Sequence, residues 1–371
     1  MKTDANRAPV ADLDYHVPAG CGITGMMSER GELLPGEIIL KSICSMNERG
    51  NGLGSGYAAY GIYPQFKDNW CFHLMCDTPE ARQNAADYIR KYFRVVHDEP
   101  IPTRTDVPLA HIPILWRYFL DALPVAPDPH GGPSAEADLV VKVVMDINRL
   151  IDGAFVFSSG KNMGIFKGVG FPGEIGEFYR IPEYKAYIWT AHNRFPTNSV
   201  GWWGGAHPFG LLDWSLIHNG EISSYGINRR YLENYGYYCT LSTDTEVMAY
   251  LFDLIVRKHG LDFETAGKIL AAPFWTQIDR VTDPQEKELL KALRVVYAPA
   301  LVTGPFAVVV ADSTHMVGLN DRVKLRPLIA ARKGDTVFIA SEEAAVRCVC
   351  PDPDRVWMPD AGTPTVARLK T

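Results

Sequence analysis

The sequence lacks the features that would direct it to a membrane, a secretory route or nucleic acid. It has no run of 18 apolar residues, so we expect no transmembrane helix. Its first 20 residues are polar and charged, unlike a secretory signal. The formal net charge is −6, whereas nucleic-acid binders usually carry a basic excess. We therefore expect neither a membrane nor nucleic acid as a partner.

Cysteine is scarce, and its spacing is not that of a metal centre. The 371 residues include seven cysteines, an odd number that fits a reducing compartment, so we expect a cytoplasmic protein. The close pairs Cys71/Cys76 and Cys348/Cys350 have neither zinc nor iron–sulfur spacing. We therefore expect no metal and no cofactor in this chain. Internal repeats and low-complexity tracts are also lacking.

What the chain does contain is a pattern of many short strands. Hydrophobic residues make up 47%, enough for a substantial core. Residues 1–20 show no apolar periodicity and are expected to form a detachable leader. Residues 154–158 and 162–167 predict a hairpin around Gly160. Further strands are predicted at 21–27, 57–63, 70–76, 184–193, 215–218, 306–312, 316–319 and 337–340, and helices at 34–46, 81–93, 136–150, 244–259 and 342–348. Many strands with few helices between them predict stacked antiparallel sheets.

Cys21, in residues 19–25 (AGCGITG), is the most informative residue. A thiol of ordinary pKa is only a few per cent thiolate at neutral pH, so it needs a base to act as a nucleophile. No histidine is spaced to pair with it. The α-amino group of Cys21, with a reference pKa of about 7.7–8.0, would serve if the Gly20–Cys21 bond were cleaved. The alternative is a small buried hydrophobic residue on a strand.

Two charged residues downstream have the chemistry to hold a free amino acid. Arg194 ends a predicted strand, and a guanidinium binds a carboxylate through two parallel hydrogen bonds. The alternative is a surface arginine in a structural ion pair. Asp244 lies in the first turn of a predicted helix and would bind an ammonium group. The alternative is that Asp244 only complements the helix dipole, beside a capping box of Thr243 and Glu246.

Asn219 and Gly220 follow a predicted strand, in residues 218–222 (HNGEI). An asparagine amide and a glycine N–H directed at one point form an oxyanion hole. Losing one such donor typically costs about 2.7–4 kcal/mol in the transition state. The alternative is a plain hairpin turn, for which Asn-Gly is the strongest short signal.

The order of these four motifs resembles that of the class II glutamine amidotransferases, a branch of the N-terminal-nucleophile hydrolases. Residues 21–25 are similar to the family's opening, and residues 192–197 (HNRFPT) to its arginine-containing strand end. The Asn-Gly and Asp244 motifs are similar to the next two. Residues 206–209 (AHPF), 319–328 (LNDRVKLRPL) and 340–342 (ASE) also match. The likeness spans the chain from Cys21 onward.

The resemblance implies an α+β fold, a four-layer αββα sandwich of two antiparallel sheets over residues 21–371. It implies an inserted lobe at about residues 78–180 and a leader, or propeptide, at residues 1–20. The implied reaction is hydrolysis of L-glutamine to L-glutamate and ammonia through a thioester on Cys21. The resemblance assigns catalysis to Cys21, Asn219 and Gly220, and substrate binding to Arg194, Thr197, His207 and Asp244.

Within this family, the likeness is closest to the amidotransferase part of glutamate synthase. It is carried by residues 195–198 (FPTN), Trp202, Trp203 and residues 159–168 (SGKNMGIFKG). It implies a partner synthase subunit that receives the ammonia and carries FMN and iron–sulfur clusters. Two alternatives stay open. One is an amidotransferase subunit for another amine acceptor, as in a methylamine-linked pathway. The other is a non-catalytic glutamine-binding regulatory module, which a retained leader would favour.

Overall fold

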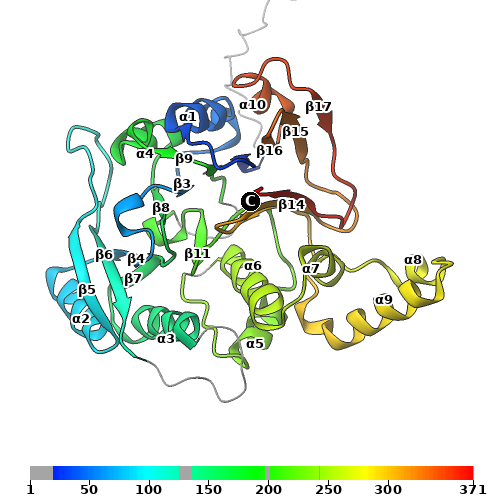
Figure 1. The fold of residues 1–371 in the computed structure, drawn as a ribbon, viewed down its shortest axis with the longest axis horizontal. Coiled ribbons are helices and arrows are strands. Elements are labelled where there is room, and N and C mark those ends of the chain that lie inside the picture. The colour runs from blue at the N-terminus through cyan, green and yellow to red at the C-terminus, as the bar shows by residue number, and fades with distance from the viewer. Residues whose placement is uncertain (1–19, 125–134, 197–200, 242, 371) are drawn as a thin grey trace, which may run out of the picture.

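Two antiparallel sheets lie face to face at the centre of the protein (Figure 1). The computed structural model describes residues 20–124, 135–196, 201–241 and 243–370. The first sheet contains β1 (Gly22–Ser28), β3 (Ser55–Tyr60), β8 (Met163–Gly168), β10 (Ile188–Asn193), β15 (Ile329–Lys333), β16 (Thr336–Ala340) and β17 (Arg355–Trp357). The second contains β11 (Phe209–Leu211), β12 (Trp214–Gly220), β13 (Phe306–Ala311), β14 (His315–Asn320) and β18 (Thr365–Arg368). Their orders are β17-β15-β16-β1-β10-β3-β8 and β11-β12-β13-β14-β18.

The space between the sheets is filled by alternating strand residues. Ile23 of β1 packs in one core with Ile217 of β12 and Val309 of β13, so the two central strands of each sheet meet there. Gly25 allows this close approach, because a Cβ at that position would lie 2.9 Å from the Met316 sulfur. Period-two alternation therefore buries one side of each strand between the sheets.

Helices cover the two outer faces and complete four layers (Figure 1). On the first sheet lie α1 (Gly36–Cys44), α4 (Pro172–Phe178) and α10 (Glu343–Arg347). On the second lie α5 (Tyr225–Glu233), α6 (Asp244–Phe252) and α7 (Phe263–Leu270), from which α8 (Trp275–Asp279) and α9 (Pro284–Val296) extend outward. The expected α+β four-layer sandwich is confirmed.

The predicted helix at residues 244–259 is present and presents an apolar face to β11 and β12. Its N-cap is Thr243, whose hydroxyl accepts from the Glu246 N–H at 3.4 Å. Val247 and Leu251 are fully buried, as the period of 3.6 predicts. After α6 the chain continues as a π-helical segment, Asp253–Lys258, and it leaves the helix before Gly260, whose φ is +68°.

A third sheet forms a lobe beside the sandwich. Its order is β5-β6-β4-β7, and α2 and α3 pack on it. The elements are β4 (Trp70–Cys76), α2 (Pro79–Arg90), β5 (Phe93–Pro100), β6 (Ile114–Ala122), α3 (Ala135–Leu150) and β7 (Ala154–Ser158). The strands of this sheet therefore come from residues 70–158, whereas β8 and α4 pack with the first sheet. A two-stranded sheet pairs β2 (Leu34–Pro35) with β9 (Lys185–Ala186).

The predicted hairpin of residues 154–158 and 162–167 is wrong. β7 pairs with β4 in the lobe, whereas β8 pairs with β3 in the first sheet. The connecting residues are bonded elsewhere: the Cys71 N–H donates to the Gly160 carbonyl at 2.8 Å, and the Lys161 N–H donates to Asp213 at 2.9 Å. These contacts separate the two strands, so a turn-like sequence links two sheets here.

Candidate active site

One cavity of about 440 Å³ lies where several distant segments meet. Its lining comes from the start of β1, the end of β10, the end of β12 and the start of α6. Five predicted site residues line it: Cys21, Arg194, His207, Gly220 and Asp244. Asn219 is fully buried next to Gly220, and Thr197 lies outside the described residues.

Strand pairing places the Cys21 sulfur at this cavity. Gly22 is the cross-strand partner of Asn193, so Cys21 lies beside the end of β10. The Phe195 N–H donates to the Cys21 sulfur at 3.2 Å. Burial raises the pKa of the Cys21 thiol, although the Phe195 bond, Arg194 and Arg326 act in the opposite direction. A thiol with a raised pKa is almost entirely protonated at neutral pH, so it needs a base to react.

The backbone of Cys21 is held by a residue that the sequence did not single out. Arg49 is 9% exposed, and its Nε donates to the Cys21 carbonyl at 3.1 Å. Its Nη1 donates to Glu342 at 2.5 Å. The Ile23 N–H donates to the Ser341 hydroxyl at 3.2 Å. The familial motif at residues 340–342 was the available signal for this support, but nothing in the sequence linked it to Arg49.

Arg194 is buried, so the alternative of an exposed surface arginine is wrong. It is 3% exposed and follows β10, where its N–H donates to the Gly54 carbonyl at 2.9 Å. The side chain fits a narrow slot between two glycines. A Cβ at Gly54 would lie 3.1 Å from the Arg194 Cδ, and one at Gly205 would lie 3.2 Å from its Nη1. Burial lowers the pKa of the guanidinium, an effect opposed by Cys21 and Asp244.

Asp244 places a carboxylate on the opposite part of the cavity wall. Its Oδ2 accepts from the Ile222 N–H at 2.9 Å, and its Oδ1 lies 3.8 Å from His218 Nδ1. Burial lowers the pKa of His218, an effect opposed by Asp244, so the imidazole is neutral at neutral pH. A neutral partner leaves the negative charge of Asp244 available to an ammonium group.

His207 shapes the wall next to Asp244. Its ring stacks on His192 with centroids 3.9 Å apart, and its Nε2 lies 3.3 Å from the Thr245 hydroxyl. Burial, with nearby positive charge, holds the pKa of His207 well below its usual value. His207 therefore contributes shape and hydrogen bonding here, and it does not contribute charge.

Asn219 and Gly220 do not form a hairpin turn, so that alternative is wrong. Both lie within β12, opposite Ala307 and Phe306 of β13. Gly220 has φ +148°, and a Cβ there would lie 1.9 Å from the Pro305 oxygen. Neither amide atom of Asn219 has a hydrogen-bond partner among the described residues. An unpaired buried amide typically costs about 1–3 kcal/mol, which marks this position as one adapted to an incoming polar group.

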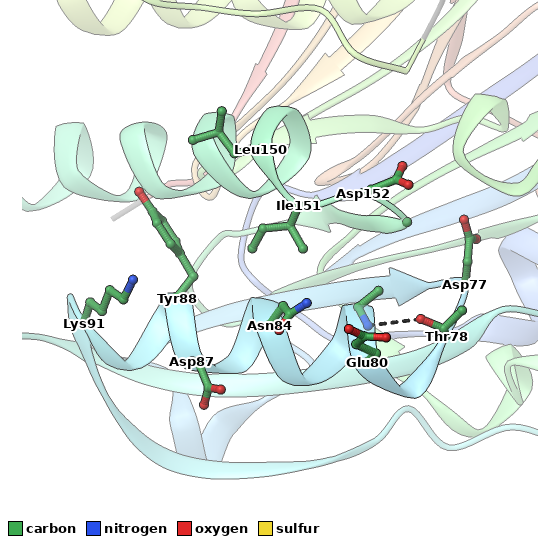
Figure 2. Close-up of a pocket in the computed structure, with 12 residues that line it drawn as sticks. Asp77, Thr78, Glu80, Asn84, Asp87, Tyr88, Lys91, Leu150, Ile151 and Asp152 are labelled. Carbon is green, nitrogen blue, oxygen red and sulfur yellow. Dashed lines mark hydrogen bonds between the residues drawn. The ribbon is translucent and has the colours of Figure 1, made fainter.

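A larger cavity of about 710 Å³ lies in the lobe, between α2 and the end of α3 (Figure 2). Its acidic side chains include Asp77, Glu80, Asp87 and Asp152, and none of the predicted site residues lines it. Within the described parts of the chain, no group of three or more His, Cys, Asp or Glu side chains is placed to hold a metal ion. None of the described helices is long and apolar enough to cross a bilayer.

Comparison with known proteins agrees with this arrangement. Residues 141–356 match the family of class II glutamine amidotransferases, and the chain belongs to that family. An uncharacterized protein of Archaeoglobus fulgidus is 49% identical over 370 residues, 98% of this chain and 96% of that protein. The glutamine amidotransferase-like protein GlxB of Rhizobium meliloti is 22% identical, over 92% of this chain and 96% of that protein.

A solved structure is also similar at low identity. It is the glutamine phosphoribosylpyrophosphate amidotransferase from B. subtilis complexed with ADP and GMP. The likeness has 16% identity and a TM-score of 0.44, and it covers 94% of this chain and 49% of that one.

Proposed function

We propose that this protein is a glutaminase subunit that hydrolyses L-glutamine and delivers the ammonia to a partner synthase. The observation that carries the proposal is the single cavity that joins the Cys21 sulfur to Arg194 and Asp244. Its two charged groups have the signs needed for the α-carboxylate and α-ammonium of a free amino acid. The side-chain amide of glutamine would then lie towards the sulfur.

The proposed first half-reaction forms a thioester. After release of residues 1–20, the free α-amino group of Cys21 takes the thiol proton, in place of the histidine that is lacking here. The sulfur attacks the side-chain carbonyl carbon, and the Asn219 amide and Gly220 N–H donate to the oxygen that becomes negative. The proton held by the α-amino group then passes to the leaving nitrogen, and ammonia departs.

The second half-reaction regenerates the thiol. Water attacks the γ-glutamyl thioester, the α-amino group accepts its proton, and the sulfur leaves with that proton. Arg194 holds the α-carboxylate, Asp244 holds the α-ammonium, and His207 and Thr197 contribute to the same pocket. Substrate is thus gripped at the end remote from the bond that breaks, which fixes the amide against the sulfur.

We also propose the ammonia acceptor: a glutamate synthase-like partner that carries the flavin and iron–sulfur clusters. The support for this is the glutamate synthase-like sequence runs at residues 159–168 and 195–198. Co-purification from the native source tests it. A flavin-containing synthase in the complex is expected, and a different amine-accepting synthetase would replace this partner with another.

A combined mass and activity measurement tests the glutaminase proposal. The protein is incubated with amide-¹⁵N-labelled L-glutamine, and ammonia and glutamate are quantified beside the intact mass of the chain. We expect equal amounts of both products from a chain that has lost residues 1–20. A native chain that retains the leader and binds glutamine without turnover would instead show a regulatory module.

A further inference from the structure

Two charged side chains lie completely buried outside the cavity and have no part in the proposed chemistry. Lys167 of β8 and Glu246 of α6 are both 0% exposed, and neither lines the cavity. Burying an ionic group without polar partners is very unfavourable. The partners of these two groups therefore indicate what each of them stabilises.

Lys167 holds the loop that supports the Arg194 guanidinium. Its ammonium donates to the Gly204 carbonyl at 2.9 Å and lies 4.3 Å from the centre of the Phe209 ring. The next residue, Gly205, forms one wall of the slot around Arg194. Lys167 thus fixes the backbone directly beside the guanidinium, across 37 residues of sequence.

Glu246 does the same for the segment that leads into Asp244. Its carboxylate accepts from the Leu241 N–H at 2.9 Å and the Thr240 N–H at 3.1 Å. A third bond comes from the Tyr250 hydroxyl at 2.9 Å. The chain that this carboxylate holds continues into Thr243 and Asp244, both of which line the cavity.

The two buried charges also support each other electrostatically. Burial raises the pKa of Glu246 to about 7, and the positive charge of Lys167 opposes that rise. Burial lowers the pKa of Lys167 to about 7, and the negative charge of Glu246 opposes that fall. Neutralising one of them therefore disfavours the ionised form of the other.

We propose that Lys167 and Glu246 are positioning residues that hold Arg194 and Asp244 at the separation required by the α-carboxylate and α-ammonium of L-glutamine. This inference rests on the proposed function. It makes selectivity for a free L-amino acid depend on two residues that never touch the substrate.

Two alkylating probes separate positioning from thiol reactivity. 6-Diazo-5-oxo-L-norleucine carries the amino and carboxyl groups of glutamine and requires the clamps, whereas iodoacetamide requires only a reactive sulfur. The rate of Cys21 labelling by each is measured by peptide mass spectrometry. We expect Lys167→Met and Glu246→Gln to slow diazoketone labelling about tenfold or more, because small displacements of positioning groups have effects of that size. Iodoacetamide labelling should stay within about twofold, since iodoacetamide makes no contact with the clamps.

Matched controls are Lys161→Met, on the turn before β8, and Glu233→Gln, at the end of α5. Their side chains are 34% and 40% exposed, and neither lines the cavity. We expect both probes to label these controls as they label the parent protein. Diazoketone labelling as fast in Lys167→Met and Glu246→Gln as in these controls would overturn the proposal. So would an equal loss with both probes, which would show general damage to the site.

The outcomes also distinguish this inference from the proposed function. If L-glutamine does not protect Cys21 of the parent protein from the diazoketone, the proposed function fails. If L-glutamine protects and D-glutamine does not, while the variants behave as the parent, only the positioning role fails. Should a single variant unfold, the double variant Lys167→Met/Glu246→Gln removes both buried charges together, and its folding is expected to suffer less than the sum of the two changes.

Discussion

The two largest cavities differ in how they are built. The cavity of the lobe is larger, about 710 Å³ against about 440 Å³, but it is walled mainly by α2 and the residues after α3. The smaller cavity collects the ends of β1, β10 and β12 and the start of α6. Only the smaller one combines a thiol, a buried guanidinium and a carboxylate. Convergence of distant segments, with their charges removed from water, is thus a better guide to chemistry than volume.

Replacing the nucleophile is the strongest test of this difference. We expect Cys21→Ala to lower glutamine hydrolysis by about 10⁴-fold or more, since removal of a covalent nucleophile leaves only binding and oxyanion contributions. Ammonia release measures it. Cys44→Ala is the control, because Cys44 has a similar intermediate exposure and lies outside the cavity. Turnover that persists without the Cys21 sulfur would remove the mechanism.

The next largest effect is expected from the unpaired amide. Asn219→Ala should lower kcat about 10²–10³-fold with little change in KM, because the amide donates only to the charge of the transition state. The melting temperature should not fall, since no hydrogen bond between described residues is lost. A matched control is Asn234→Ala, at the exposed end of α5. A fall in stability that accounts for the lost activity would make Asn219 structural.

A smaller effect is expected at the carboxylate clamp. Arg194→Lys keeps the positive charge but cannot form two parallel bonds, so kcat/KM should fall about 10–100-fold through KM. Initial rates over a range of glutamine concentrations measure this. Arg229→Lys, on the exposed face of α5, should change nothing. An unchanged KM would mean that the guanidinium does not bind the substrate.

The smallest effect is expected in the larger cavity. Glu80→Gln and Asp87→Asn should leave glutaminase activity within about twofold. Glu80 lies in the first turn of α2, so its neutralisation should destabilise the fold by about 0.3–1 kcal/mol through the helix dipole. Denaturant titration beside the activity assay separates the two readouts. A large loss of activity without loss of stability would give the lobe cavity a role in the reaction.

Local patterning predicted the elements whose signals lie within a few residues. The strand at residues 70–76 and the capped helix that begins at Asp244 were predicted because alternation and capping are short-range features. Strands β5 and β6 were missed because prolines obscure the alternation in that stretch. The wrong hairpin at residues 154–167 had a suitable turn, but bonds from Cys71 and Asp213 decided the pairing.

The candidate site divides in the same way. Cys21, Arg194 and Asp244 were found from their motifs and order, and the structure brings them to one cavity. Arg49 and Lys167 were not found, because their roles depend on partners distant in sequence. The Arg49–Glu342 bond spans 293 residues, and no periodicity or spacing rule reports such a contact.

The pairing of β3 with β8 bears on how this chain acquired its length. Tyr60 and Met163 are cross-strand partners, so residues 61–162 depart from and return to a single point on the edge of the first sheet. A segment with adjoining ends can enter a gene in one event without reordering any strand of the ancestral sandwich. Its later removal would be harder, because Phe72 and Val144 now share a core with Leu251 and would leave that helix uncovered.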